Sequence, residues 1–268
     1  MTVRSLLRVL WTLSVYSTIR RLARRSGVTD EEFHGSLPGD EVMPHPMIEW
    51  TRATTINAPP EDVWPWLVQM GFGRGGWYTN ERFDRLVWRV DNKSSEVLLP
   101  EWQNLQVGDI VPDGPGFAAY FRVLELRENE TIVYHSIRHP YRGRPVDPTD
   151  EEAVARRERE LIEGGVYIDF SWTFVLRPAK EGTTRLLLRV RSDLYPPWVR
   201  VTETLFGLVD LFHVTTMFRG IKRRAESGAK SGPGPVARPQ GSGSPSSVGR
   251  GVTDPSAFNA SSKRSRVI

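Results

Sequence analysis

Cysteine is absent from the 268-residue sequence. Its absence excludes disulfide bonds, thiolate metal sites and a cysteine nucleophile together. The sequence also lacks an HExxH pattern, and its histidines are scattered without the spacing that metal ligands require. These histidines are His34, His45, His135, His139 and His213. We therefore expect no metal site.

Acidic charge is missing from the N-terminal end of the chain, although the net charge of the whole chain is only +4. Residues 1–26 contain six arginines and no acid, and residues 227–268 carry a net +5. The middle of the chain, residues 27–226, is thereby left at −7. Because phosphate binding needs basic charge on the docking surface, we expect the folded part to bind no nucleic acid.

A hydrophobic run long enough to cross a membrane is also missing near the N-terminus. The uncharged stretch from Val9 to Ile19 has 11 residues, whereas a membrane-spanning helix needs about 20. Arg20 and Arg21 follow it, where a signal peptide would have small residues at its cleavage site. We predict a basic amphipathic helix over 1–26, with residues 1–25 either contacting a membrane surface or packing on the protein's own core. The expected location is the cytoplasm, with the first alternative at the inner face of the membrane.

The C-terminal segment is poor in apolar residues. Residues 227–268 consist mostly of Ser, Gly and Pro with scattered basic residues. Such a segment buries too little apolar surface to offset the entropy lost on ordering. We therefore predict a disordered tail and one folded domain over 35–226.

The pattern within this domain predicts an α+β fold. We expect a strand at 48–57, a short helix from Val63 to Met70, and a second helix at 79–89 with Thr79 as N-cap. Further strands are expected at 108–112, 117–126, 131–138, 166–177 and 184–192. The charged stretch 139–165 interrupts them, either as a short solvated helix or as a lid over a site.

A long helix is expected at 198–226, after Pro196 and Pro197. Its apolar residues recur at helical spacing and form a stripe that would face a core. The stripe consists of Val201, Leu205, Leu208, Val209 and Phe212 and continues to Phe218 and Ile221.

Residues 64–78 read WPWLVQMGFGRGGWY and combine glycines with aromatic residues. The glycines at 71, 73, 75 and 76 lack the dinucleotide spacing and follow a predicted helix, not a strand. The Gly-Lys-Ser/Thr of a phosphate loop is also absent, so we expect no cofactor. The glycines instead predict a sharp turn between two short helices, with left-handed backbone angles.

Several segments together resemble a known family. They are LPGDEV (37–42), TRATTINAPPEDVWPWLVQMGFGRGGWYT (51–79), LQVGDIVPDG (105–114) and GIKRRAE (220–226). They resemble the SRPBCC superfamily (START-like, polyketide cyclase/dehydrase-like), and more closely its uncharacterised bacterial members with an APxxVWPWLxQMGxGRGGWY signature. The resemblance covers about residues 35–226. It implies a helix-grip fold, in which a curved antiparallel sheet wraps around the long C-terminal helix and two short helices follow the first strand.

The same resemblance implies a hydrophobic cavity between sheet and helix, where members of the superfamily bind lipids, sterols or polyketides. The residues expected to line it are Trp64, Trp66, Gln69, Arg74, Trp77, Tyr78 and Trp172, with core packing as the alternative for each aromatic residue. For Arg74 a structural role at a helix C-terminus is favoured over binding of a ligand carboxylate. The leading hypothesis is thus a binder of a small hydrophobic or amphipathic ligand.

Two alternatives stay open. A polyketide cyclase or dehydratase would need an ionisable group in the cavity, and the candidates are Asp169, His135 and Tyr167. The sequence does not reveal which face of the sheet these strand residues occupy, and Arg52, Arg189 and Arg191 could instead pair with Asp169 or Glu49 in a surface ladder. The second alternative is an interaction module without a ligand.

Overall fold

The computed structural model describes residues 3–91, 93–140 and 143–231. Most of the predicted C-terminal tail, 227–268, lies outside these residues. The described residues belong to one compact unit.

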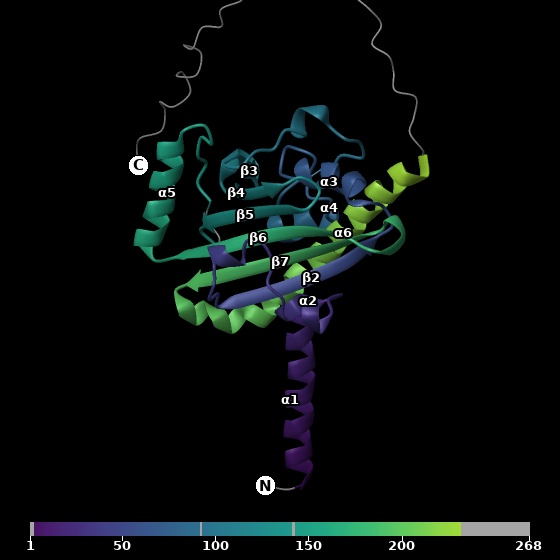
Figure 1. Cartoon of the computed structure of the whole chain (residues 1–268). Coiled ribbons are helices and arrows are strands. Elements are labelled where there is room, and N and C mark those ends of the chain that lie inside the picture. Colours follow the sequence, from purple (N-terminus) through teal and green to yellow (C-terminus); the bar gives the residue numbers. More distant parts are fainter. Residues whose placement is uncertain (1–2, 92, 141–142, 232–268) are drawn as a thin grey trace, which may run out of the picture. The chain divides into compact units, whose positions relative to one another are not determined.

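The centre of this unit is a seven-stranded sheet (Figure 1). Neighbouring strands are antiparallel except the short β1, which pairs in parallel with β2. In spatial order the strands are β1 (Arg25–Ser26), β2 (Ile48–Ile56), β7 (Thr184–Tyr195), β6 (Tyr167–Pro178), β5 (Thr131–Arg138), β4 (Tyr120–Arg127) and β3 (Ile110–Pro112).

The long helix α6 (Glu203–Ser231) crosses one face of the sheet, and the short helix α3 (Pro60–Val68) packs beside it (Figure 1). This arrangement is the helix-grip fold that the sequence predicts. Strand alternation explains the core, because even-numbered residues of β6, such as Trp172 and Phe174, join α6 residues such as Met217 in one buried cluster. We call this the inner face of the sheet.

The outer face of the sheet is covered by residues 27–46, which we call the strap. It contains α2 (Asp30–His34), whose N-terminus has a capping box between Thr29 and Glu32. Leu37 of the strap packs against outer-face residues of the sheet, including Val175 and Leu187. The charged insertion forms α5 (Glu151–Gly164), as the solvated-helix alternative predicts, with Val154 and Leu161 buried.

Two local predictions are wrong, and the first is the N-cap of the second short helix. This helix consists of α4 (Glu81–Phe83) and the π-helical turn η2 (Asp84–Trp88). Its N-cap is Asn80, which accepts hydrogen bonds from two backbone N–H groups. Thr79 instead donates its hydroxyl to Asp84. The remaining short helical turns are η1 (Asp40–Val42), η3 (Pro100–Trp102), η4 (Pro115–Phe117), η5 (Lys180–Gly182) and η6 (Pro197–Thr202).

The second wrong prediction concerns the apolar stripe of the C-terminal helix. Val214, Met217, Phe218 and Ile221 are buried against the sheet, but the predicted N-terminal half of the stripe is not. Val201, Leu205 and Phe212 are exposed, because α6 turns residues such as Gly207 toward the domain instead.

The N-terminal segment forms α1 (Val3–Arg24), and Figure 1 shows it leaving the domain beside the N-terminal part of α6. The expected division into an apolar and a basic side is not observed, because apolar residues between Leu10 and Leu22 are exposed all round the helix. Among the residues that the structure describes, we find no helix that is both long and apolar enough to cross a membrane.

Candidate functional site

The segment from α3 to Tyr78 turns sharply on its glycines, as the sequence predicts. Gly71 and Gly76 pair with each other across the turn and have φ angles of +133° and +79°. A side chain on Gly75 would collide with Gln69, whose backbone oxygen would lie 2.8 Å from the added Cβ. The turn therefore depends on glycine and brings Trp77 and Tyr78 back beneath α3.

Gln69 and Tyr78 are joined in a buried hydrogen-bond network. Gln69 Nε2 donates to Tyr78 Oη (2.9 Å), which in turn donates to the Trp66 carbonyl (2.9 Å). Gln69 Oε1 accepts hydrogen bonds from the Leu99 N–H and from Gln103 Nε2. These bonds use the polar atoms of both side chains, so the structure gives both residues a structural role.

Four aromatic rings from four segments meet on the inner face, and we call them the aromatic interior. Phe121 of β4 lies at its centre, with ring centroids 5.7 Å from Trp77, 5.6 Å from Tyr134 and 5.1 Å from Trp172. Trp77 and Trp172 also contact each other, at 5.4 Å. All four side chains are buried in the main core cluster.

Three polar atoms of this aromatic interior have no hydrogen bond to any residue that the structure describes. Trp77 Nε1, Trp172 Nε1 and Tyr134 Oη are inaccessible to solvent and have no hydrogen-bond partner among the described residues. A buried polar group without a partner costs about 1–3 kcal/mol, and native proteins leave few such groups. Burial raises the pKa of the Tyr134 hydroxyl, so it remains a protonated donor at neutral pH.

Arg74 lies at the edge of this interior. Its Nη2 donates to the carbonyl of Val68, the last residue of α3, at 2.9 Å. Its guanidinium lies over the Trp102 ring, 4.6 Å from the centroid, and burial lowers its pKa. The favoured structural role at a helix end is thus observed, while Nε stays buried without an acceptor among the described residues.

Trp64 and Trp66, the remaining residues predicted to line a cavity, lie on α3 and are buried in the same cluster. Sequence reasoning missed Phe121 and Tyr134. Their strands are predicted, but the face that each residue occupies depends on pairing with strands distant in sequence. Tyr134 pairs with Trp172 across β5 and β6, and this places both on the inner face.

The three catalytic candidates lie on the outer face, away from the aromatic interior. His135 Nε2 is 2.7 Å from Asp169 Oδ1, and both side chains are partly exposed. Tyr167 stacks on Tyr195 with ring centroids 4.4 Å apart. Side chains alternate between the two faces along β5 and β6. Tyr134, next to His135, and Phe170, next to Asp169, lie on the inner face with Trp172, so the three candidates lie on the outer face.

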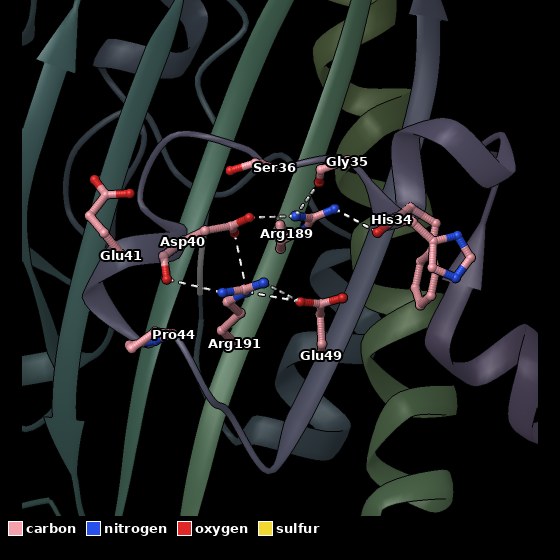
Figure 2. Close-up of a pocket in the computed structure, with 10 residues that line it drawn as sticks. His34, Gly35, Ser36, Asp40, Glu41, Pro44, Glu49, Arg189 and Arg191 are labelled. Carbon is pink, nitrogen blue, oxygen red and sulfur yellow. Dashed lines mark hydrogen bonds and ion pairs between the residues drawn. The ribbon is translucent and has the colours of Figure 1, made fainter.

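A hollow of about 450 Å³ opens on the outer face between the strap and β7 (Figure 2). Arg189 and Arg191 line it, and Figure 2 shows both directed at acids and carbonyls of the strap and of β2. Arg189 Nη1 donates to Asp40 at 2.8 Å and to the Gly35 carbonyl at 2.9 Å. Arg191 binds Glu49 through Nε and Nη2, at 2.8 and 2.7 Å. These bonds line the hollow and hold the strap against the sheet.

The predicted ladder of arginines and acids is therefore partly right. Arg191 pairs with Glu49 as predicted, but Asp169 pairs with His135, and Arg52 faces the other way. Arg52 lies on the inner face, where its Nη2 donates to Asp210 of α6 at 3.0 Å. A second hollow, of about 190 Å³, lies beside Arg52 between β2 and α6.

Comparisons with known proteins reveal distant likenesses among solved structures. No family model matches the chain, and no curated protein matches it. Among solved structures, a conserved protein from Geobacillus kaustophilus is 12% identical, with a TM-score of 0.37 over 67% of this chain and 96% of that one.

Two further solved structures are similar to this chain at the same distance. A hypothetical protein from Helicobacter pylori is 9% identical, with a TM-score of 0.41 over 71% of this chain and 95% of that one. Truncated norcoclaurine synthase from Thalictrum flavum is 12% identical, with a TM-score of 0.37 over 65% of this chain and 91% of that one. Such distances assign no ligand and no activity to this chain.

Proposed function

We propose that this protein binds a small, mainly apolar molecule that carries hydrogen-bond acceptors, in the aromatic interior between the sheet and α6. The observation that carries the proposal is a set of three buried donors that have no acceptor in the described part of the chain: Trp77 Nε1, Trp172 Nε1 and Tyr134 Oη. A ligand with carbonyl, carboxylate or ether oxygens would satisfy them, and the surrounding rings would cover its apolar body.

The neighbouring charge also favours a ligand rich in acceptors. Arg74 is close enough to Tyr134 for its positive charge to act against the rise in the pKa of that hydroxyl. Its own Nε is a fourth buried donor with no acceptor within residues 3–91, 93–140 and 143–231. The interior thus offers donors and the guanidinium of Arg74, which are complementary to an oxygen-bearing or anionic group.

The alternative function, a cyclase or dehydratase acting in the same interior, has less support. It needs an acid or base beside the substrate, whereas Asp169 and His135 pair with each other on the outer face. The resemblance to the SRPBCC superfamily is compatible with either function, because that fold hosts both binders and enzymes.

Two measurements test the proposal. Native mass spectrometry of the full chain, purified without detergent, should reveal a bound molecule that is released on denaturation. In a titration with the fluorescent probe 1-anilinonaphthalene-8-sulfonate, which has an aromatic body and acceptor oxygens, we expect one saturable site. Trp172→Phe keeps a ring in place but removes the N–H, and should weaken the affinity for the probe about fivefold.

Trp50→Phe is the matched control. Trp50 Nε1 is also buried without an acceptor among the described residues, but it lies beside Gly207 and not among the four rings. Its substitution should leave the affinity for the probe unchanged. Equal losses in both variants, or a chain with neither a bound molecule nor a saturable site, would contradict the proposal.

A further inference from the structure

Helix α1 exposes large apolar side chains to solvent. Between residues 10 and 22 these are Leu10, Trp11, Leu13, Val15, Tyr16, Ile19 and Leu22, and Trp11 is 71% exposed. At its C-terminal end Ala23 is buried in the domain. An isolated helix of this composition gains little stability in water. We therefore expect its apolar side chains to be covered by another molecule.

A second exposed apolar surface adjoins α1. It consists of Trp198, Val201, Leu205, Phe206 and Phe212 on η6 and α6, with Trp198 73% and Val201 82% exposed. Arg20 and Arg24 of α1 both reach Glu203 of α6 at 3.7 Å, and this connects the two surfaces. Together they form one extended apolar region, which we call the docking surface.

The docking surface carries positive charge with little exposed acid. Residues 1–26 contain six arginines and no acid. Along residues 196–219 the acids are Glu203 and Asp210, and both pair with arginines, whereas Arg200 and Arg219 are exposed. Apolar side chains framed by cations are complementary to a bilayer that contains anionic lipids.

We propose that α1 and the exposed residues of η6 and α6 dock this protein on the surface of a bilayer containing anionic lipids. The uncharged stretch from Val9 to Ile19 is about 16 Å long as a helix, roughly half the hydrocarbon thickness of a bilayer. We place the helix within the headgroup and outer acyl region of one leaflet, where the exposed Arg21 reaches lipid phosphates.

A second copy of the chain is a less suitable occupant. In a symmetric dimer built on this surface, the arginines of one copy would meet those of the other. No exposed acid within residues 1–26 or 196–219 of the described chain would compensate them, and like charges facing each other weaken association. Anionic lipid headgroups supply the missing negative charge.

Co-sedimentation of the full chain with vesicles tests the proposal. We expect binding to vesicles of phosphatidylcholine mixed with phosphatidylglycerol, and much weaker binding to phosphatidylcholine alone. Leu13→Glu on α1 and Val201→Glu on η6 should each lower the partition coefficient about tenfold, because an apolar contact is lost and a negative charge is added. Arg21→Gln should lower it about fivefold on the mixed vesicles alone.

Val107→Glu is the matched control, because Val107 is 61% exposed and lies outside the docking surface. It should bind vesicles like the wild type. Circular dichroism should give the same spectrum for all variants, since each substituted side chain is exposed. Binding that is equal on both kinds of vesicle, or unaffected by Leu13→Glu and Val201→Glu, would overturn the proposal. So would an oligomer in light scattering that Leu13→Glu dissociates, in a protein that binds no vesicles.

Discussion

Removal of one hydroxyl from the aromatic interior is expected to stabilise the ligand-free protein. Tyr134 is fully buried, and its Oη has no hydrogen-bond partner among the described residues. Burial of a hydroxyl without a partner costs about 1–3 kcal/mol, and Tyr134→Phe removes this cost while keeping the ring. We expect the free energy of unfolding to rise by about 1 kcal/mol and the melting temperature by about 2–4 °C.

Tyr78→Phe makes the same chemical change, but we expect it to change the free energy of unfolding in the opposite direction. Tyr78 is also buried, but its Oη donates to the Trp66 carbonyl and accepts from Gln69 Nε2, each at 2.9 Å. The substitution leaves these two groups buried with one partner fewer. We therefore expect the free energy of unfolding to fall by about 1–3 kcal/mol.

Urea unfolding of ligand-free wild type and both variants at pH 7, followed by circular dichroism, gives the two differences. Burial raises the pKa of both tyrosines, so both hydroxyls are neutral throughout the measurement. The reasoning fails if Tyr134→Phe loses as much stability as Tyr78→Phe. Such a result would mean that the Tyr134 hydroxyl is hydrogen-bonded in the ligand-free protein, and the proposed site would lose a donor.

Two further predictions concern the strap and α6. The hydrogen bond from Arg185 lowers the pKa of Glu32 below its ordinary value of 4.5, so this carboxylate stabilises the fold above that pH and the stabilisation is lost as pH falls. Glu32→Gln should therefore cost about 1–2 kcal/mol in urea unfolding at pH 7 and less at pH 3, and an equal cost at both would refute this. Gly220→Ala should destabilise the fold by about 1–3 kcal/mol, because its Cβ would lie 2.2 Å from the Tyr78 carbonyl oxygen. Gly228→Ala, whose Cβ would meet open space on the same helix, should be neutral or stabilising. Thermal melts of both glycine variants and the wild type measure the two effects.

Local sequence patterns predicted much of the fold. The alternation of Ile168, Phe170, Trp172, Phe174 and Leu176 predicts a strand with one apolar face, and in β6 this face joins the inner core. The outer-face residues Ser171, Thr173 and Val175 are buried as well, which the alternation does not predict. The glycines after α3 predicted a turn with left-handed angles, because few other residues adopt them at low cost. Such features depend on neighbours in the sequence, so the sequence alone is sufficient to predict them.

These local patterns did not predict which distant segments contact each other. The stripe that includes Val201, Leu205 and Phe212 has helical spacing, but the spacing is the same whether a sheet, a membrane or a partner covers it. In the same way, Asp169 and Tyr134 each have a place in an alternating strand. Only the pairing of β5 with β6 decides that the acid faces outward and the phenol inward. The sequence therefore predicted the elements better than the chemistry that they bring together.

The two faces of the sheet carry different kinds of polar group. On the outer face, Arg189 and Arg191 have acids and carbonyls as partners, and these bonds hold the strap in place. On the inner face, indole and phenol donors have no acceptor among the residues that the structure describes, while apolar rings surround them. Charged groups suited to proton transfer, such as His135 and Asp169, occur on the face where a strap is fastened. A ligand held on the inner face, as we propose, would meet these donors and rings and would lie away from the His135–Asp169 pair.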